Sequence, residues 1–332
     1  MSDEAEAFPS ARLDDNTLQW PSSPEIQRAL STIDSSIASA YPSVRGARAR
    51  EALGKYIGVD PEWITLGCGS DEILDGAFRA FAKPGAIVSF PDPTFGMVPI
   101  FAAANNLQCA PVCIEGSYDF DCDALLANDP AIIYLCSPNN PTGGAIARSA
   151  LERILRETSG IVILDEAYAE FAERSDVDLV TKFDRLLVLR TLSKAFGLAG
   201  LRVGYAVGSP KLIARLNEVR APYPVNVVAE TAVIAAVGPG REWMKDRVAE
   251  TRRIRSRFLA ALTDAGITVL PSEANFVLIT GIDAVKTARE LEHAGIYVRV
   301  LRSLAGIGDA IRLTIAPWPV MERALAVLRA AQ

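Results

Sequence analysis

Residues 131–143 read AIIYLCSPNNPTG, and this stretch decides the fold class. Its first six residues form an uninterrupted apolar run, and similar runs occur at residues 161–164 (IVIL) and 186–189 (LLVL). Short apolar runs without polar alternation are typical of strands that are buried on both faces of a parallel sheet. A helical pattern at residues 149–157 separates the first two runs. This order of strand, helix and strand predicts an α/β sheet with right-handed crossovers.

The second half of the chain has a different pattern. After Pro222-Tyr223-Pro224, two long helices are predicted at residues 225–237 and 241–265. A short stretch at 275–280, a helix at 283–294, strands at 297–300 and 311–315, and a final helix from residue 320 follow. A chain of 332 residues exceeds one typical domain. We expect an N-terminal segment (1–40) that packs on the small domain or on a dimer partner, a large domain (41–224) with a mostly parallel sheet flanked by helices, and a smaller α+β C-terminal domain (225–332).

Composition and charge exclude several classes of function. The formal net charge is -6, and the densest basic stretch, residues 252–257, is typical of a solvated helix face, so we expect no nucleic-acid partner. No apolar stretch of about 18 residues occurs, so we expect no membrane span. The N-terminal sequence MSDEAEAFPS lacks the basic start and apolar run of a signal peptide, which favours a cytoplasmic protein.

The cysteines and the histidine argue against metal chemistry. There are five cysteines and no Cys-x-x-Cys pair, so we expect buried thiols in a reducing cytoplasm, with no zinc site and no disulfide framework. The single histidine, His293, lies in a helical pattern beside Glu292. We therefore expect no bound metal and no Ser-His-Asp triad.

Polar residues follow four of the predicted strands, and the first group is the turn GCGSDE at residues 67–72. In open α/β sheets, ligands bind beyond the carboxyl ends of the strands. Glycines let the backbone approach an anion, and the start of the helix predicted over 70–82 supplies free N–H groups. The candidates for such a contact are Gly69, Ser70 and Asp71. An ordinary turn between a strand and a helix is the alternative.

The second group is SPNNPTG at residues 137–143, directly after the first apolar run. Two prolines and a glycine predict a rigid turn. Such a turn presents Asn140 in one orientation, in which its amide can donate to an oxygen on a ring. A plain Asn-Pro turn is the alternative.

The third group is ILDEAY at residues 163–168, where Asp165 ends an apolar strand. A carboxylate is costly to bury there unless it meets a cation, and a protonated pyridine nitrogen is such a cation. Tyr168, three residues on, could add a second hydrogen bond to the ring oxygen. A carboxylate that caps the next helix is the alternative.

The fourth group is RTLSKAFGLAGLRVG at residues 190–204. Lys194 lies between a hydroxyl pair and a glycine-rich segment, with an arginine eight residues later. Ser193 and Arg202 could bind a phosphate while Lys194 forms an imine. A surface lysine is the alternative, although the context is apolar.

Taken together, these segments resemble the fold-type-I pyridoxal-phosphate aminotransferases, whose fold is like that of aspartate aminotransferase, and most closely the histidinol-phosphate aminotransferase family. The resemblance runs from about Asn16 to the C-terminus and is carried by SPNNPTG at 137–143 and RTLSKAFGLAGLR at 190–202. It implies a pyridoxal-phosphate-dependent transferase of nitrogenous groups in amino-acid biosynthesis. The expected substrates are an amino donor and a 2-oxo acid acceptor, with 2-oxoglutarate and glutamate as the co-substrate pair.

The resemblance also implies roles for individual residues. Lys194 would bind the cofactor covalently and carry protons, and Asp165 would pair with the ring nitrogen. The remaining cofactor contacts would come from Asn140 and Tyr168 at the ring oxygen, Phe95 stacked on the ring, and Gly69, Ser70, Asp71, Ser193 and Arg202 at the phosphate. Tyr41, in Tyr41-Pro42, resembles the tyrosine that reaches the phosphate from a neighbouring subunit, so a homodimer with shared active sites is expected.

Substrate contacts implied by the resemblance are Arg312, which would grip a carboxylate, Arg299, which would lie near a substrate phosphate, and Asn16. A structural ion pair is the alternative for Arg312. The chain departs from the family pattern at residues 13–18, where Leu18 stands where some relatives place a tyrosine, and at Ala316-Pro317-Trp318.

Three hypotheses for the function follow. The first is transamination of histidinol phosphate or an aromatic amino acid. The second is a decarboxylase of an amino-acid phosphate, or a pyridoxal-phosphate-dependent oxidase, on the same scaffold, because residues 13–18 and 316–318 are altered. The third is a catalytically silent cofactor-binding module, since a fold alone does not fix a function.

Overall fold

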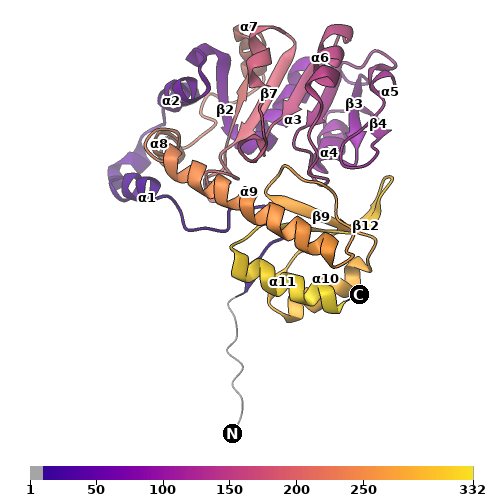
Figure 1. The fold of residues 1–332 in the computed structure, drawn as a ribbon. Helices are drawn as coiled ribbons and strands as arrows, with labels where there is room; N and C mark the ends of the chain where they lie inside the picture. The colour runs from indigo at the N-terminus through magenta and orange to yellow at the C-terminus, as the bar shows by residue number, and fades with distance from the viewer. Residues whose placement is uncertain (1–9, 332) are drawn as a thin grey trace.

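The computed structural model describes residues 10–331. Residues 1–9 and residue 332 lie outside the described residues. The first nine include most of the sequence that was compared with a signal peptide and the start of the predicted segment 1–40. Figure 1 shows a large sheet with helices on its faces, a smaller group of C-terminal elements beside it, and a long helix, α9, that runs between the two.

Seven strands form the large sheet, in the order β2-β8-β7-β6-β5-β3-β4. In that order they are Ile64–Cys68, Val203–Val207, Leu186–Thr191, Ile161–Asp165, Ile132–Cys136, Ile87–Asp92 and Gln108–Cys113. β8 runs antiparallel to both of its neighbours, and every other pairing is parallel. The predicted, mostly parallel sheet is therefore confirmed.

Successive side chains of each strand point to opposite faces of this sheet. Because both sets are apolar, each face forms an apolar layer that helices cover. One layer contains α3 (Gly69–Phe81), α4 (Met97–Ala104) and α7 (Pro210–Glu218). The other contains α2 (Ala47–Ile57), α5 (Cys122–Leu126), α6 (Arg148–Glu157) and α8 (Val227–Val237). The strand residues are buried on both sides, which is why the sequence shows continuous apolar runs there.

The C-terminal elements form a second apolar core around an antiparallel sheet, β11-β12-β9. Its strands are Arg299–Leu304, Gly308–Thr314 and Phe276–Thr280, and they pack with α9 (Arg241–Asp264), α10 (Ala284–His293) and α11 (Trp318–Ala330). This arrangement agrees with the predicted smaller α+β part. The domain boundaries at residues 40 and 224 stay predictions.

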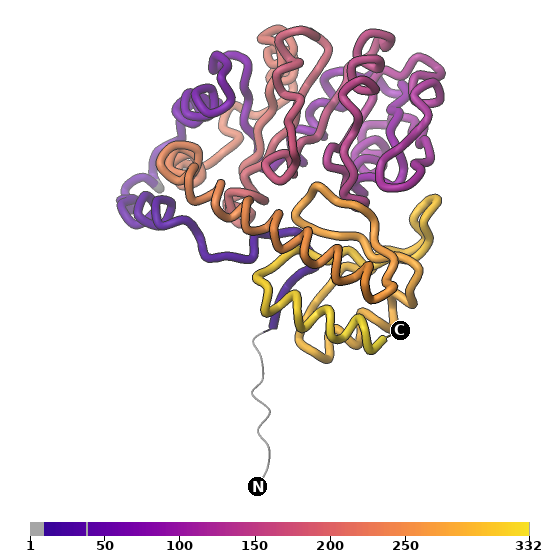
Figure 2. Tube along the Cα trace, in the orientation of Figure 1, coloured from indigo at the N-terminus to yellow at the C-terminus, as the bar shows by residue number. Residues whose placement is uncertain are grey.

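The N-terminal residues contact both parts of the molecule. β1 (Ala11–Arg12) pairs in parallel with β10 (Ile296–Tyr297), and Leu13 is buried in the C-terminal core. α1 (Pro24–Ser31) contacts α8 beside the large sheet. Figure 2 shows this indigo segment passing beside the yellow C-terminal elements before it reaches α1.

Several element boundaries differ from the predicted ones for local reasons. The helix predicted from residue 225 begins at Val227, because Asn226 caps it by accepting a hydrogen bond from the Ala229 amide at 2.8 Å. The strand predicted over 297–300 is divided into β10 and β11, because β10 pairs with β1 and β11 pairs with β12. No helix within residues 10–331 has the length and apolar character needed to cross a membrane.

Candidate active site

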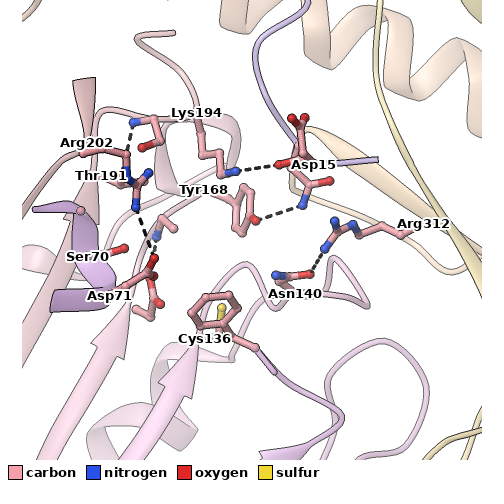
Figure 3. A pocket seen from close by; sticks show the side chains of 16 residues that line it. Asp15, Ser70, Asp71, Cys136, Asn140, Tyr168, Thr191, Lys194, Arg202 and Arg312 are labelled. Carbon is pink, nitrogen blue, oxygen red and sulfur yellow. Dashed lines mark hydrogen bonds and ion pairs between the residues drawn. The ribbon is translucent and has the colours of Figure 1, made fainter. Parts of the chain in front are cut away.

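A cavity of about 230 Å³ lies beyond the carboxyl ends of β5, β6 and β7, where the C-terminal strand β12 and the N-terminal segment meet the large sheet. Figure 3 shows its lining. The lining residues are Asp15, Asn16, Gly69, Ser70, Asp71, Phe95, Cys136, Asn140, Asp165, Ala167, Tyr168, Thr191, Ser193, Lys194, Arg202 and Arg312. All site residues predicted from the sequence are in this set except Tyr41 and Arg299.

Lys194 lies in the turn that follows β7, and its side chain points into the cavity (Figure 3). Its Nζ donates a hydrogen bond to the Asp15 carbonyl at 3.0 Å. Burial, followed by the nearby charge of Arg312, lowers the pKa of the Lys194 amine to about 8. An amine with such a pKa is mainly charged at neutral pH but has a much larger neutral fraction than an ordinary lysine, and the neutral form is the nucleophile. The surface-lysine alternative is therefore wrong.

Asp165 is the last residue of β6 and is 4% exposed. Its Oδ1 accepts a hydrogen bond from the Ala167 amide at 3.0 Å, and its Oδ2 accepts one from the Tyr134 hydroxyl at 2.8 Å. Burial raises the pKa of Asp165 to about 6. No α-helix follows directly, since the next element is a 3-10 turn whose N-cap is Tyr168. Asp165 therefore does not cap a helix; it is a buried carboxylate at the wall of a cavity, without an ion-pair partner in residues 10–331.

Two amide side chains face the middle of the cavity. Asn16 Nδ2 donates to the Tyr168 hydroxyl at 3.0 Å, so the Tyr168 proton remains available to a ligand. Asn140 Oδ1 accepts a hydrogen bond from Arg312 Nη1 at 2.6 Å (Figure 3). Because that bond fixes the amide, the Asn140 NH₂ group is left as a donor, as the sequence predicted for this turn.

Arg312 lies on β12 and carries an uncompensated charge. Its Nη2 donates to the Asp14 carbonyl at 2.8 Å, and its buried Nε has no hydrogen-bond partner in the described residues. Within residues 10–331 it forms no ion pair with a carboxylate, so the structural-ion-pair alternative is not supported. Burial lowers the pKa of Arg312, and the charge of Arg299 adds to this effect. A guanidinium in this state is suited to bind an anionic ligand.

The other end of the cavity is built like an anion cradle. Gly69 begins α3 with φ +77°, and its amide donates to the Arg202 carbonyl at 3.0 Å. A Cβ atom at Gly69 would lie 2.6 Å from Arg202 Nη2, and the positive φ would strain any other residue, so this position favours glycine. Arg202 Nη2 lies 3.3 Å from Asp71 Oδ2. The cap residue Cys68 provides no side-chain hydrogen bond to the first turn of α3, which leaves helix N–H groups for a ligand.

Two predicted residues lie outside the cavity. Tyr41 is 82% exposed and stacks on Tyr223, with ring centroids 4.8 Å apart. Arg299 is exposed on β11 and pairs with Arg312 across the β11–β12 register. Neither side chain lines the cavity in the single chain, although Arg299 neighbours the lining residue Arg312, so their predicted roles stay predictions.

Four lining residues were missed by sequence reasoning: Asp15, Cys136, Ala167 and Thr191. Each lies within or next to a motif described above, so its position in the sequence was the one feature that could have indicated a place in the cavity. Asp15 contributes a backbone carbonyl, whose position no side-chain pattern reveals. Within residues 10–331 no cluster of three or more His, Cys, Asp or Glu side chains could hold a metal ion.

The comparisons with known proteins agree with this geometry. The family model for aminotransferase class I and II matches residues 12–328. The histidinol-phosphate aminotransferase of Thermoanaerobacter pseudethanolicus is 37% identical over 289 residues, 86% of this chain and 82% of the relative. The one from Aeromonas hydrophila subsp. hydrophila is 36% identical over 308 residues, 90% of this chain and 86% of the relative.

Solved structures show the same fold. The histidinol-phosphate aminotransferase of Sinorhizobium meliloti, solved in complex with pyridoxal-5'-phosphate, has a TM-score of 0.88 at 24% identity and covers 97% of this chain and 90% of its own. The aspartate aminotransferase of Thermus thermophilus with maleate has a TM-score of 0.82 at 21% identity, covering 98% and 92%. With the family model spanning nearly its whole length, this chain belongs to the class I and II aminotransferases.

Proposed function

We propose that the chain uses pyridoxal phosphate to transfer an amino group from histidinol phosphate, or a similar anionic amino donor, to 2-oxoglutarate. The observation that carries the proposal is one cavity that holds a half-buried amine with lowered pKa, Lys194, together with a buried carboxylate, Asp165, and an unpaired guanidinium, Arg312. Relatives 37% and 36% identical to the chain are named histidinol-phosphate aminotransferases.

The residues of the cavity fit pyridoxal phosphate. The start of α3 with Arg202 would hold its phosphate, since Gly69 leaves a space there that a Cβ would fill. Asp165 would pair with the ring nitrogen, and Asn140 and Tyr168 would hold the ring oxygen. When bound, pyridoxal phosphate supplies an electron sink for bond changes at the α carbon of the donor. Asp165, buried and without another cation, would keep the ring nitrogen protonated and so strengthen that sink.

The proton carrier of the site would be Lys194. Its pKa of about 8 is close to working pH, so Nζ can both accept and return a proton. A positioned general base of this kind contributes ~10²–10⁴-fold to rate. The hydrogen bond to the Asp15 carbonyl keeps Nζ inside the cavity while it is not bonded to the cofactor.

Arg312 would bind the anionic group of each substrate in turn. Histidinol phosphate and 2-oxoglutarate both carry an anionic group apart from the reacting carbon, and the two must occupy the same site one after the other. The guanidinium already has its orientation fixed by Asn140 and by the Asp14 carbonyl. A preoriented, unpaired guanidinium is able to accept either anion without rearrangement.

The test is a donor screen on the purified protein supplied with pyridoxal phosphate. We expect histidinol phosphate to reduce the visible absorbance of the bound cofactor, 2-oxoglutarate to restore it, and glutamate to accumulate in equal amount. If an aromatic amino acid produces glutamate and histidinol phosphate does not, the donor is wrong. Release of carbon dioxide or consumption of oxygen, without glutamate, would support the decarboxylase or oxidase hypothesis instead. Absence of any turnover would support the silent module.

We also propose that the active enzyme is a homodimer that shares its active sites. Tyr41 and Val44 are 82% and 57% exposed, and the exposed Tyr223 stacks on Tyr41. The two segments are tied together by the Arg45 amide, which donates to the Pro222 carbonyl at 2.8 Å. An exposed, contiguous set of large apolar side chains is typical of an interface. This supports the prediction that Tyr41 reaches the cofactor phosphate of a neighbouring subunit.

Complementation between two inactive variants tests the shared site. Lys194→Ala and Tyr41→Ala homodimers should each have low activity, whereas a mixture that exchanges subunits should regain activity through hybrid dimers with one intact site. No recovery, or a monomer in sedimentation at working concentration, would contradict the dimer. The expected compartment is the cytoplasm, where unpaired thiols persist. The prediction that the thiols are buried is wrong for Cys68, Cys109 and Cys113, which are exposed; only Cys136 is buried and Cys122 is half-buried.

A further inference from the structure

Asp165 has a partner that belongs to none of the four sequence motifs. Tyr134 lies on β5, two residues before Cys136, which pairs with Asp165 of β6 in the parallel register. Its hydroxyl donates a hydrogen bond to Asp165 Oδ2 at 2.8 Å. Tyr134 is 0% exposed and Asp165 is 4% exposed, so water does not compete for this bond. A hydrogen bond in such surroundings is electrostatically stronger than one at the surface.

The direction of this hydrogen bond is fixed by its environment. Burial raises the pKa of the Tyr134 phenol well above its ordinary value, so the phenol keeps its proton and acts as the donor. The other carboxylate oxygen, Oδ1, accepts from the Ala167 amide at 3.0 Å. Each oxygen of Asp165 therefore has its own donor, and the two donors fix the plane of the carboxylate.

The other titratable groups near Asp165 do not favour its charged form. Those that face it are Asp71 of α3, Glu166, Cys136 of β5, Tyr118 and Tyr168. Asp71 and Glu166 raise the pKa of Asp165, as burial does. The Tyr134 hydroxyl and the Ala167 amide act in the opposite direction and lower the pKa of Asp165, and the hydroxyl has the larger effect. The hydrogen bond from Tyr134 is thus the main side-chain contact that favours the charged form of this carboxylate.

We propose that Tyr134 is a positioning residue that holds the Asp165 carboxylate in place as the partner of the ring nitrogen of pyridoxal phosphate. It acts through Asp165, because its side chain is fully buried behind the cavity lining and its hydroxyl donates to Asp165. The inference rests on the proposed function, since it assigns Tyr134 a role toward the same cofactor. A backbone amide holds one oxygen of Asp165 and cannot be changed by a substitution, whereas the hydroxyl on the other oxygen can be removed.

The experiment measures binding of pyridoxal phosphate to the apoprotein between pH 5 and 9, by quenching of intrinsic fluorescence. Tyr134→Phe removes only the hydroxyl. Loss of a hydrogen bond to a charged group should weaken cofactor binding and move the acid limb of the binding profile upward by about 1–2 pH units, or roughly 10- to 100-fold in proton affinity. With saturating cofactor, kcat should fall while KM for the donor stays unchanged.

Tyr118→Phe is the matched control. Tyr118 is also a buried tyrosine, but its hydroxyl accepts a hydrogen bond from the Cys136 amide at 2.9 Å and does not contact Asp165. This variant should leave the acid limb in its wild-type position. Thermal unfolding of each variant shows that it is folded. A 3-fluorotyrosine at position 134 retains the ring and, as a stronger donor, should move the limb to lower pH even if the phenylalanine variant were unstable.

A double-mutant cycle decides whether Tyr134 acts through Asp165. In an Asp165→Asn background, Tyr134→Phe should have no further effect on cofactor affinity. The proposal is overturned if Y134F binds with the wild-type pH profile, or if it weakens binding equally in the D165N background. If the wild-type protein does not bind pyridoxal phosphate at all, the proposed function itself fails, and the two failures are distinguished by that single measurement.

Discussion

Replacing Arg312 with methionine separates a ligand-binding role for this side chain from a structural one. In the apoprotein the guanidinium donates only to Asn140 and to a backbone carbonyl, and its Nε is buried without a partner in residues 10–331. Burial lowers its pKa, so the charge is costly until an anion binds. Methionine removes that charge and retains most of the apolar stem. We therefore expect apoprotein stability to be unchanged or raised, while activity falls.

The size of the loss follows from the geometry. Removing one partner of a desolvated, hydrogen-bonded charge pair costs about 2–5 kcal/mol, which is roughly a 30- to 4,000-fold loss in kcat/KM. The same variant also removes a positive charge beside Lys194, so the pKa of that amine should rise above about 8. Arg302→Met is the matched control, because Arg302 is an exposed arginine on the neighbouring strand β11.

The assay compares kcat/KM for the donor and for 2-oxoglutarate with the melting temperature of the apoprotein. Both kcat/KM values should fall in R312M and neither should change in R302M. If the melting temperature of R312M falls by more than ~4 °C while kcat/KM is unaffected, Arg312 stabilises the fold and does not bind the substrates.

Three further outcomes are expected. The rate at which the apoprotein reacts with pyridoxal phosphate should rise about tenfold per pH unit below the Lys194 pKa of about 8 and level off above it, because only the neutral amine reacts. Stopped-flow absorbance measures this rate, and a rate that does not change with pH contradicts the prediction. Arg190→Met should cost about 3–5 kcal/mol in urea unfolding at neutral pH, since it leaves the buried carboxylates of Glu166 and Glu170 unpaired. The loss of stability should grow as pH rises above ~4.3. Burial raises the pKa of Glu170 in the folded state, and Arg190 opposes that effect, so ionising Glu170 costs more once Arg190 is removed. Gly204→Ala should abolish tight cofactor binding in an equilibrium titration, because a Cβ there would lie 2.2 Å from the backbone nitrogen of Ser70 at the start of α3. Gly200→Ala is the control and should bind normally, because a Cβ there meets nothing within 4 Å.

Much of the fold could be predicted because its central strands are buried on both faces. The runs at 131–136, 161–164 and 186–189 coincide with β5, β6 and β7 to within two residues. β4 was not predicted, because it is an edge strand with four of its six residues exposed and a proline inside it. β8 was missed for another reason: its sequence, VGYAV, is short and directly continues the glycine-rich segment of the motif at 190–204.

The site was predictable where one side chain carries the chemistry and one strand end presents it. Asp165, Lys194 and Asn140 follow consecutive neighbours of the sheet, so their meeting follows from parallel order alone. Tyr134 could not be found in this way. It is an apolar-strand residue by pattern, and only the register that places Cys136 opposite Asp165 brings its hydroxyl to the carboxylate.

One physical cause, burial, links the two central residues of the cavity, because it penalises the charged form of each. Asp165 has a folded-state pKa raised to about 6, so its contribution to stability is present at low pH and is lost as pH rises through that value. Lys194 has one lowered to about 8, so its contribution is present at high pH and is lost as pH falls through that value. Between about 6 and about 8 both side chains are mainly charged, each in surroundings that penalise its charge. A ligand that brings a cation to Asp165 and takes up the Lys194 amine removes both penalties at once, and pyridoxal phosphate is such a ligand.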